Sequence, residues 1–217
     1  MNIIQNIDYN NANSPWQLGD LYIPAGAGPY PIALCIHGGG WSAMDRYSFA
    51  GVAEYMSSQG FAALNIEYRL LGVAPWPACG DDCITAAKFL LDGGIKDIEL
   101  KTDKLFIVGA SAGGHLALMT GMRLPAEKVS GIVSISGVTS LEICFRKPGF
   151  RIDYKTFWGY EPSQDDIKEA SPIDLITAAQ PPVLCTHCPV DNVVGIEHAE
   201  SFVSKCIDLG ARAELFK

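Results

Sequence analysis

The strongest chemical signal in the sequence is "KLFIVGASAGGHLALM", which places Ser111 between Gly109 and Gly113 as Gly-x-Ser-x-Gly. An apolar run of strand length precedes the serine and a helix-like run follows it. This context predicts a tight strand-to-helix turn that holds the hydroxyl out of the backbone. The start of the helix adds free N–H groups and a positive dipole end beside that hydroxyl. We therefore expect Ser111 to be a nucleophile rather than a structural turn residue.

A second signal is the glycine triplet in "PIALCIHGGGWSAMD", which follows another strand-like run. Main chain without side chains can turn its N–H groups toward a ligand, which is what an oxyanion hole requires. Alone, such a triplet indicates a flexible turn, but beside the serine motif the two features complement each other. Trp41, directly after the glycines, is expected either to form a wall of the acyl or alcohol pocket or to pack its own loop.

The elements that must position these motifs alternate along the chain. Short, nearly continuous apolar runs are typical of buried parallel strands, and longer segments, three of which close on glycine, are typical of helices. This alternation predicts an α/β fold with a doubly wound, mostly parallel sheet and antiparallel strands at its N-terminal edge. The expected strands lie at 16–24, 31–37, 61–68, 104–110, 131–136, 181–187 and 213–217, and the expected helices at 47–60, 79–94, 111–124 and 195–210.

Residues 139–171 interrupt this rhythm with aromatics, prolines and charges that follow no clean period. The segment falls between two predicted strands, on the side where open α/β sheets bind ligands. Either it is a helical excursion with an ordinary loop, or it is a small cap over a substrate pocket. In the second case Phe157, Trp158 and Tyr160 would supply apolar pocket walls. The rest of 1–217 shows no linker or repeat, so we expect one domain.

Taken together, these motifs resemble the α/β-hydrolase fold serine esterases that carry His-Gly-Gly-Gly, especially the bacterial branch with Trp directly after it. Further matching pieces are "YRL" at 68–70, "WPACGDDCITAAKFL", "AGGH" at 112–115 and the segment from 170 to 202. The resemblance extends over nearly the whole chain. It implies an α/β-hydrolase fold and serine-dependent hydrolysis, as in acetyl-xylan or feruloyl esterase-like and kynurenine-formamidase-like enzymes.

The resemblance also implies roles for individual residues. Ser111 is the expected nucleophile, and the main-chain N–H groups of Gly39, Gly40 and Ala112 are expected to form the oxyanion hole. Asp191, in "PVDNVV" after a predicted strand, matches the acid position. A carboxylate there would fix the tautomer of a catalytic histidine and stabilise its charged form. The alternative is that Asp191 is only a turn residue, since Asp-Asn is a common turn pair.

The expected catalytic histidine has no match among the four histidines of the sequence. In this fold the histidine follows the acid along the chain, and His37, His115 and His187 all precede Asp191. His198 lies within a predicted helix, whereas the family's histidine follows the last strand. That strand is expected at "AELFK", where the sequence ends. We therefore expect the C-terminal segment with the catalytic base to be absent, and the 217 residues to be almost inactive toward esters.

The resulting functional hypothesis is a serine carboxylester hydrolase that acts through an acyl-Ser111 intermediate. Short acyl or aryl esters, such as those on plant-wall carbohydrates, are the substrates that the resemblance implies. One alternative is a kynurenine-formamidase-like amide hydrolase. The other is a catalytically silent α/β-hydrolase that binds a ligand or a partner through an intact pocket.

Composition limits the possible partners and location. A formal net charge of −8 argues against nucleic acid, and no apolar run reaches the ~20 residues of a membrane helix. The first residues lack the pattern of a secretory signal, so we expect a cytoplasmic protein.

The seven cysteines are scattered through the sequence, which fits reduced, buried thiols. The pair Cys185 and Cys188 lacks a well-spaced second pair of ligands for zinc. We expect no metal or cofactor, and an exposed sheet edge could allow a dimer.

Overall fold

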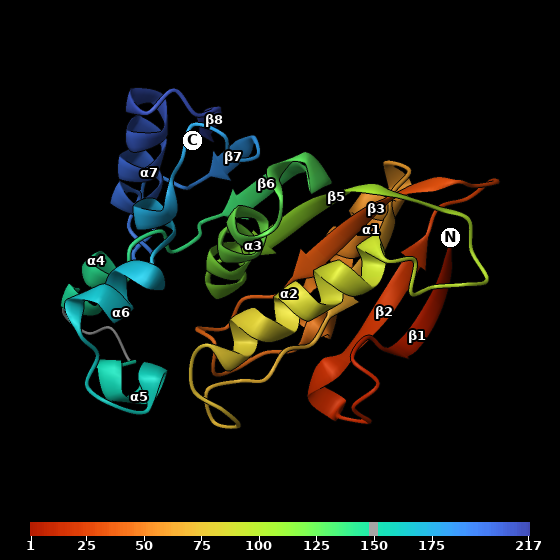
Figure 1. Ribbon diagram of the computed structural model, residues 1–217, viewed down its shortest axis with the longest axis horizontal. Helices are drawn as coiled ribbons and strands as arrows, with labels where there is room; N and C mark the ends of the chain where they lie inside the picture. The colour runs from red at the N-terminus through yellow and green to blue at the C-terminus, as the bar shows by residue number, and fades with distance from the viewer. Residues whose placement is uncertain (148–151) are drawn as a thin grey trace.

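The structure is a computed structural model that describes residues 1–147 and 152–217. Its centre is an eight-stranded sheet with the strand order β1-β2-β4-β3-β5-β6-β7-β8 (Figure 1). The strands β3 to β8 run parallel, while β1 and β2 pair antiparallel at one edge. The strands are β1 (Asn2–Asp8), β2 (Leu18–Ile23), β3 (Tyr30–Ile36), β4 (Ala62–Ile66), β5 (Leu100–Ala110), β6 (Val129–Ile135), β7 (Val183–Thr186) and β8 (Ala213–Phe216).

The expected α/β sheet with an antiparallel N-terminal edge is therefore confirmed. The strand β1 was not among the predicted strands, because it lies at the open edge and its residues Asn2 to Asn6 are exposed. The four predicted long helices are all present. The α-helices are α1 (Ala50–Ser58), α2 (Ala78–Leu91), α3 (Ala112–Arg123), α4 (Leu141–Arg146), α5 (Tyr154–Trp158), α6 (Gln164–Glu169) and α7 (Glu197–Asp208).

Four 3-10 helices complete the described elements. They are η1 (Pro15–Gln17), η2 (Arg46–Phe49), η3 (Ala126–Lys128) and η4 (Pro172–Leu175). The segment 139–171, expected as a possible cap, contains the short helices α4, α5 and α6, which gather at one end of the molecule (Figure 1). Residues 148–151 of that segment lie outside the described residues.

Alternating side chains of the strands separate two hydrophobic clusters, one on each face of the sheet. In β3, Leu34 belongs to the larger cluster with residues of α2, α3 and α7, whereas Cys35 belongs to the smaller cluster with residues of α1. Leu105 and Phe106 alternate in the same way on β5. This period of two follows from strand geometry. It means that three long helices cover one face and α1 covers the other.

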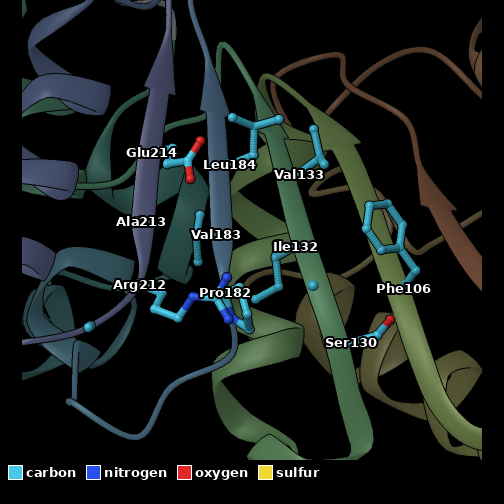
Figure 2. Close-up of a pocket in the computed structure, with 12 residues that line it drawn as sticks. Phe106, Ser130, Ile132, Val133, Pro182, Val183, Leu184, Arg212, Ala213 and Glu214 are labelled. Atoms are coloured by element: carbon cyan, nitrogen blue, oxygen red, sulfur yellow. The ribbon is translucent and has the colours of Figure 1, made fainter.

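The face that carries α1 is only partly covered over β5 to β8 by the described residues. A hollow of about 470 Å³ lies there, and Figure 2 shows Phe106, Val133, Leu184 and Glu214 along it. A neighbouring hollow of about 420 Å³ also includes Phe106 and Val133 and reaches α1. The apolar runs of β5 and β6 led us to expect strands covered on both faces, so this opening is a difference from the prediction.

Parallel β3, β5, β6 and β7 all end at the same edge of the sheet, so the loops that follow them are neighbours. The glycine triplet follows β3, Ser111 follows β5 and Asp191 comes five residues after β7. The sheet therefore gathers the sequence-predicted residues at one edge. No helix among the described residues is long and apolar enough to cross a membrane.

Candidate active site

Ser111 lies between the end of β5 and the start of α3, with φ of 54° and ψ of −118°. A positive φ is costly for a residue with a Cβ, so the surrounding structure must hold this conformation. Two main-chain hydrogen bonds do so: the Ser111 N–H donates to the Ile135 carbonyl at 2.8 Å, and the Ser111 carbonyl accepts from the His115 N–H at 3.1 Å. The result is the strained strand-to-helix turn that the sequence motif predicts.

The glycines on either side of Ser111 are required by close backbone contacts. A Cβ at Gly113 would lie 2.2 Å from the Ile36 carbonyl oxygen and 2.3 Å from that of His37. A Cβ at Gly109 would lie 2.1 Å from the Gly113 carbonyl oxygen. The start of α3 therefore packs directly on the end of β3, and this contact brings the serine turn against the glycine loop.

The glycine loop is held in left-handed conformations over three consecutive residues. Gly39, Gly40 and Trp41 have φ of 104°, 58° and 56°. The Gly39 carbonyl accepts hydrogen bonds from the N–H groups of Ser42 and Ala43, which close the turn. A Cβ at Gly39 would lie 2.0 Å from the Ala43 carbonyl oxygen, so a larger residue does not fit.

The loop and the serine turn are in contact, because a Cβ at Gly38 would lie 3.4 Å from the Ser111 Cβ. Within the part of the chain that the structure describes, the main-chain N–H groups of Gly39, Gly40 and Ala112 donate to no protein acceptor. Ala112 is the first residue of α3, where a helix leaves its N–H groups unpaired. The three N–H groups predicted to form the oxyanion hole thus have no acceptor among the described residues.

Asp191 is half-buried in the loop after β7. Its Oδ1 accepts hydrogen bonds from the N–H groups of Val193 at 2.8 Å and Val194 at 3.0 Å. Burial alone would raise the pKa of Asp191, but these hydrogen bonds, the nearby His187 ring and a hydrogen bond with the Ser136 side chain outweigh it and lower the pKa below its ordinary value. The side chain is therefore an anion held by its own loop and by Ser136, and the loop hydrogen bonds also fit the turn role left open by the sequence.

Two of the four histidines are fixed on the nucleophile side of the site. His37 contacts the Gly38 carbonyl through Nδ1 at 2.7 Å, and its ring stacks on Tyr68. His115 accepts from the Trp41 Nε1–H through Nδ1 at 3.2 Å and donates from Nε2 to the Ala170 carbonyl at 2.8 Å. Burial lowers the pKa of His115 to about 4, which keeps the ring neutral.

The other two histidines are fixed on the acid side. His187 Nε2 contacts the Val194 carbonyl at 2.8 Å. His198 Nδ1 accepts from the N–H groups of Thr139 and Ser140, and burial lowers the pKa of His198 to about 4. All four histidines belong to the described residues, and none of them hydrogen-bonds to the Ser111 hydroxyl or the Asp191 carboxylate. No histidine therefore connects Ser111 to Asp191, the residues predicted to be the nucleophile and the acid.

Three residues predicted to line the substrate pocket are buried against one another. Trp41, Phe157 and Trp158 are at most 3% exposed. The ring of Phe157 packs edge-on against Trp41 at 5.1 Å and against Trp158 at 4.5 Å between centroids. Trp41, directly after the glycines, is therefore packed into the core by Phe157, as in the loop-packing alternative. Tyr160, the fourth predicted wall residue, is 50% exposed.

The cap segment does reach the glycine loop through another residue. A Cβ at Gly40 would lie 3.4 Å from the Cδ1 atom of Ile152, which precedes α5. Sequence reasoning missed Ile152 because a single aliphatic residue in an irregular segment carries no periodic signal. It also gave no role to Glu67, a buried carboxylate directly after β4; a charge at the end of an apolar strand was the available signal.

The cysteines show no special chemistry at this site. Burial raises the pKa of the Cys185 thiol to about 12, whereas Cys188 is exposed. Among the described residues no three histidine, cysteine or acidic side chains cluster in a way that could hold a metal ion.

Comparison with known proteins agrees with this architecture. The BD-FAE family model matches residues 19–206. Versiconal hemiacetal acetate esterase of Aspergillus parasiticus is 32% identical over 124 residues, which cover 54% of this chain and 38% of that protein. Esterase LipC of Mycobacterium tuberculosis is 29% identical over 205 residues, covering 82% of this chain and 48% of that protein.

A solved structure described as a truncated form of a carbohydrate esterase from gut microbiota superposes with a TM-score of 0.85 at 20% identity, covering all of this chain and 87% of that one. Its likeness supports the fold alone. The chain spans less than half the length of the two curated relatives named above. Because the family model covers most of its residues, the chain belongs to the BD-FAE family and has the α/β-hydrolase fold.

Proposed function

We propose that the chain is the body of a serine carboxylester hydrolase for short acyl or aryl esters, including acylated carbohydrates. The observation that carries the proposal is the contact between the strained Ser111 turn and a loop whose N–H groups are free. Attack by Ser111 Oγ on an ester carbonyl would form a tetrahedral oxyanion. The N–H groups of Gly39, Gly40 and Ala112 would stabilise that charge.

In the proposed reaction the oxyanion collapses and expels the alcohol, which leaves an acyl group on Ser111. Water then attacks this acyl-enzyme and releases the acid. Both steps need a base to accept a proton, and the four histidines of the sequence form hydrogen bonds with groups other than Ser111 and Asp191. We therefore propose that these 217 residues alone turn over esters slowly. Asp191 would orient and stabilise a histidine that they do not supply.

Trp41, Phe157 and Trp158 would act in this reaction by keeping the glycine loop in place. Contact with substrate at this end would fall to Ile152, which lies against Gly40. The names of two relatives support an ester substrate, since one is called an acetate esterase and the other an esterase.

The proposal is tested by trapping the acyl-enzyme. The chain is incubated with p-nitrophenyl acetate and digested, and the modified peptides are identified by mass spectrometry. We expect the acetyl group on Ser111, because slow deacylation lets the intermediate accumulate. Ser111→Ala and the exposed Ser58→Ala are the paired controls, and only the first should lose the label. Acetylation spread over surface lysines with none on Ser111 would contradict the proposal.

The absence of a bound histidine base at Ser111 favours one second candidate, a catalytically silent binding protein. It would bind short esters without forming an acyl-enzyme.

The amide-hydrolase alternative is distinguished from the esterase by supplying imidazole as an external base and comparing the hydrolysis of p-nitrophenyl acetate with that of N-formylkynurenine. Ester cleavage that depends on Ser111 and exceeds amide cleavage supports the esterase.

A further inference from the structure

We propose that Tyr68 is a positioning residue that orients the Gly38–Gly39 peptide of the oxyanion hole, together with His37. This inference rests on the proposed function, because it concerns how the same hole is assembled. Tyr68 lies two residues after β4 and is fully buried, and its ring stacks on that of His37 with centroids 4.3 Å apart.

Two side chains contact the carbonyl oxygen of Gly38. The Tyr68 hydroxyl lies 3.1 Å from it and 3.0 Å from the His37 carbonyl oxygen. His37 Nδ1 lies 2.7 Å from the Gly38 oxygen, and since a carbonyl only accepts, Nδ1 must carry the proton and donate it. The carbonyl is therefore held on the side where the Tyr68 and His37 rings lie.

The orientation of this carbonyl determines where the next N–H points. In a trans peptide the C=O of one residue and the N–H of the following residue point in opposite directions. The described cis peptides are elsewhere, at Gly28–Pro29 and Trp76–Pro77. Holding the Gly38 carbonyl against Tyr68 thus turns the Gly39 N–H away from it. That N–H has no protein acceptor, and Gly38 packs against Ser111.

Glu67 faces the His37 ring from its other side. Its Oε2 lies 3.5 Å from His37 Nε2, and its Oε1 accepts from the main-chain N–H and the guanidinium of Arg46. Arg46 Nε is also paired with buried Asp20 at 2.9 Å. A buried carboxylate with these partners has little freedom to move, so Glu67 is a fixed neighbour of the His37 ring.

Glycine makes such fixing necessary. Gly38 and Gly39 have no Cβ, so their backbone can adopt many orientations that other residues cannot. A peptide of this kind would rotate between donor-inward and donor-outward states unless its carbonyl were held. Because burial raises the pKa of Tyr68 well above its ordinary value, its hydroxyl stays protonated and donates throughout the neutral and mildly alkaline range.

Kinetics of Tyr68→Phe test this role, with imidazole supplied as external base and p-nitrophenyl acetate as substrate. The rate of Ser111→Ala is subtracted so that only turnover through Ser111 is counted. We expect kcat to fall about tenfold with KM within about twofold of the parent, since loss of a whole oxyanion donor costs about 10²–10³ and a loosened donor costs less.

Tyr30→Phe is the control. The Tyr30 hydroxyl also donates to a main-chain carbonyl, that of Gly26, at 2.6 Å, but Tyr30 begins β3, at the end of the strand away from the glycine loop. We expect its kcat to stay within about twofold of the parent, as its hydrogen bond affects stability alone. An unchanged kcat in Tyr68→Phe, or an equal loss in Tyr30→Phe, would overturn the proposal.

Crystal structures of the parent and of Tyr68→Phe separate this inference from the proposed function. We expect the Gly38 carbonyl to face Tyr68 in the parent, and to turn away or take two orientations in the variant. An identical single orientation in both would refute the positioning role. If instead no turnover through Ser111 is detected in any variant, the proposed function fails, and the two crystal structures still decide whether Tyr68 orients the peptide.

Discussion

The two sides of the candidate site differ in how completely the chain fixes them. On the nucleophile side, Ser111 and the glycine loop are held by backbone contacts so close that a Cβ at Gly113 would lie 2.2 Å from a carbonyl oxygen. On the acid side, Asp191 is half-buried, and its carboxylate is held by the N–H groups of its own loop and by the Ser136 side chain. Close backbone packing thus holds the Ser111 side in place, whereas no histidine hydrogen-bonds to Asp191 on the other side.

This difference shows that the two halves depend on different parts of the chain. Contacts among β3, β5 and α3 hold the Ser111 turn, and all of these elements are present. Under the proposed function, Asp191 needs a histidine partner, and none of the four histidines hydrogen-bonds to it. Mutations on the nucleophile side should therefore affect folding strongly, while mutations of the acid should have small effects.

The largest effect is expected from Gly113→Ala. Its methyl group would overlap the carbonyl oxygens of Ile36 and His37, so α3 or β3 must shift, and we expect a loss of more than about 4 kcal/mol in the free energy of unfolding. Urea unfolding followed by circular dichroism measures it. Gly72→Ala is the control, because Gly72 is exposed with nothing near its Cβ, and it should change stability by less than about 0.5 kcal/mol. Equal stabilities of the two variants would show that the packing is looser than described.

A smaller effect is expected from pH. The pKa values of His115 and His198 are about 4 in the folded protein, below the ordinary 6.5 of the unfolded chain. Between these values the unfolded chain binds more protons than the folded one, so stability must fall as the pH falls from about 6.5 to 4. Each histidine should contribute up to about 3 kcal/mol to that loss.

Replacing His115, which links Trp41 to Ala170, should show how much this histidine contributes to the loss of stability at low pH. In His115→Gln the pH dependence of the urea midpoint between 6.5 and 4 should be shallower than in the parent, whatever the variant's stability at pH 7. A slope that does not change would mean that His115 is not the neutral, buried group described here.

The smallest effect is expected from Asp191→Asn. In a complete serine triad this change costs about 10⁴ in turnover because the histidine tautomer is lost. Here no histidine is in place, so hydrolysis of p-nitrophenyl acetate without added base should change by less than about tenfold. The asparagine keeps an oxygen to accept the Val193 and Val194 N–H groups, so stability should be similar. A 10⁴-fold loss would reveal a histidine already working with Asp191.

Sequence reasoning was most successful where local chemistry determines structure. Gly-x-Ser-x-Gly between a strand and a helix predicts a tight turn with a strained serine, and Ser111 adopts this conformation in the structure. The end of β7 likewise located Asp191 in the following loop. The burial of Trp41 against Phe157 could not be predicted, because 116 residues separate the two and only tertiary packing joins them.

The contact between the Tyr68 hydroxyl and the Gly38 carbonyl could not be predicted for a similar reason. Tyr68 was recognised only as part of a matching motif, because its hydroxyl reaches Gly38 only through the parallel pairing of β3 with β4. The edge strand β1 was missed because polar residues interrupt its apolar ones. The open hollow over β5 to β8 also went unpredicted, because an apolar strand pattern does not tell which helix covers each face.

We propose that Ser111 and its oxyanion hole are assembled in this chain, while none of its four histidines acts as the base. The imidazole dependence of p-nitrophenyl acetate hydrolysis tests this, with the Ser111→Ala rate subtracted at each concentration. We expect a Ser111-dependent rate that is near zero without imidazole and rises as imidazole is added. A high Ser111-dependent rate without imidazole, unchanged by its addition, would show that a base within these residues completes the site and would refute the proposal.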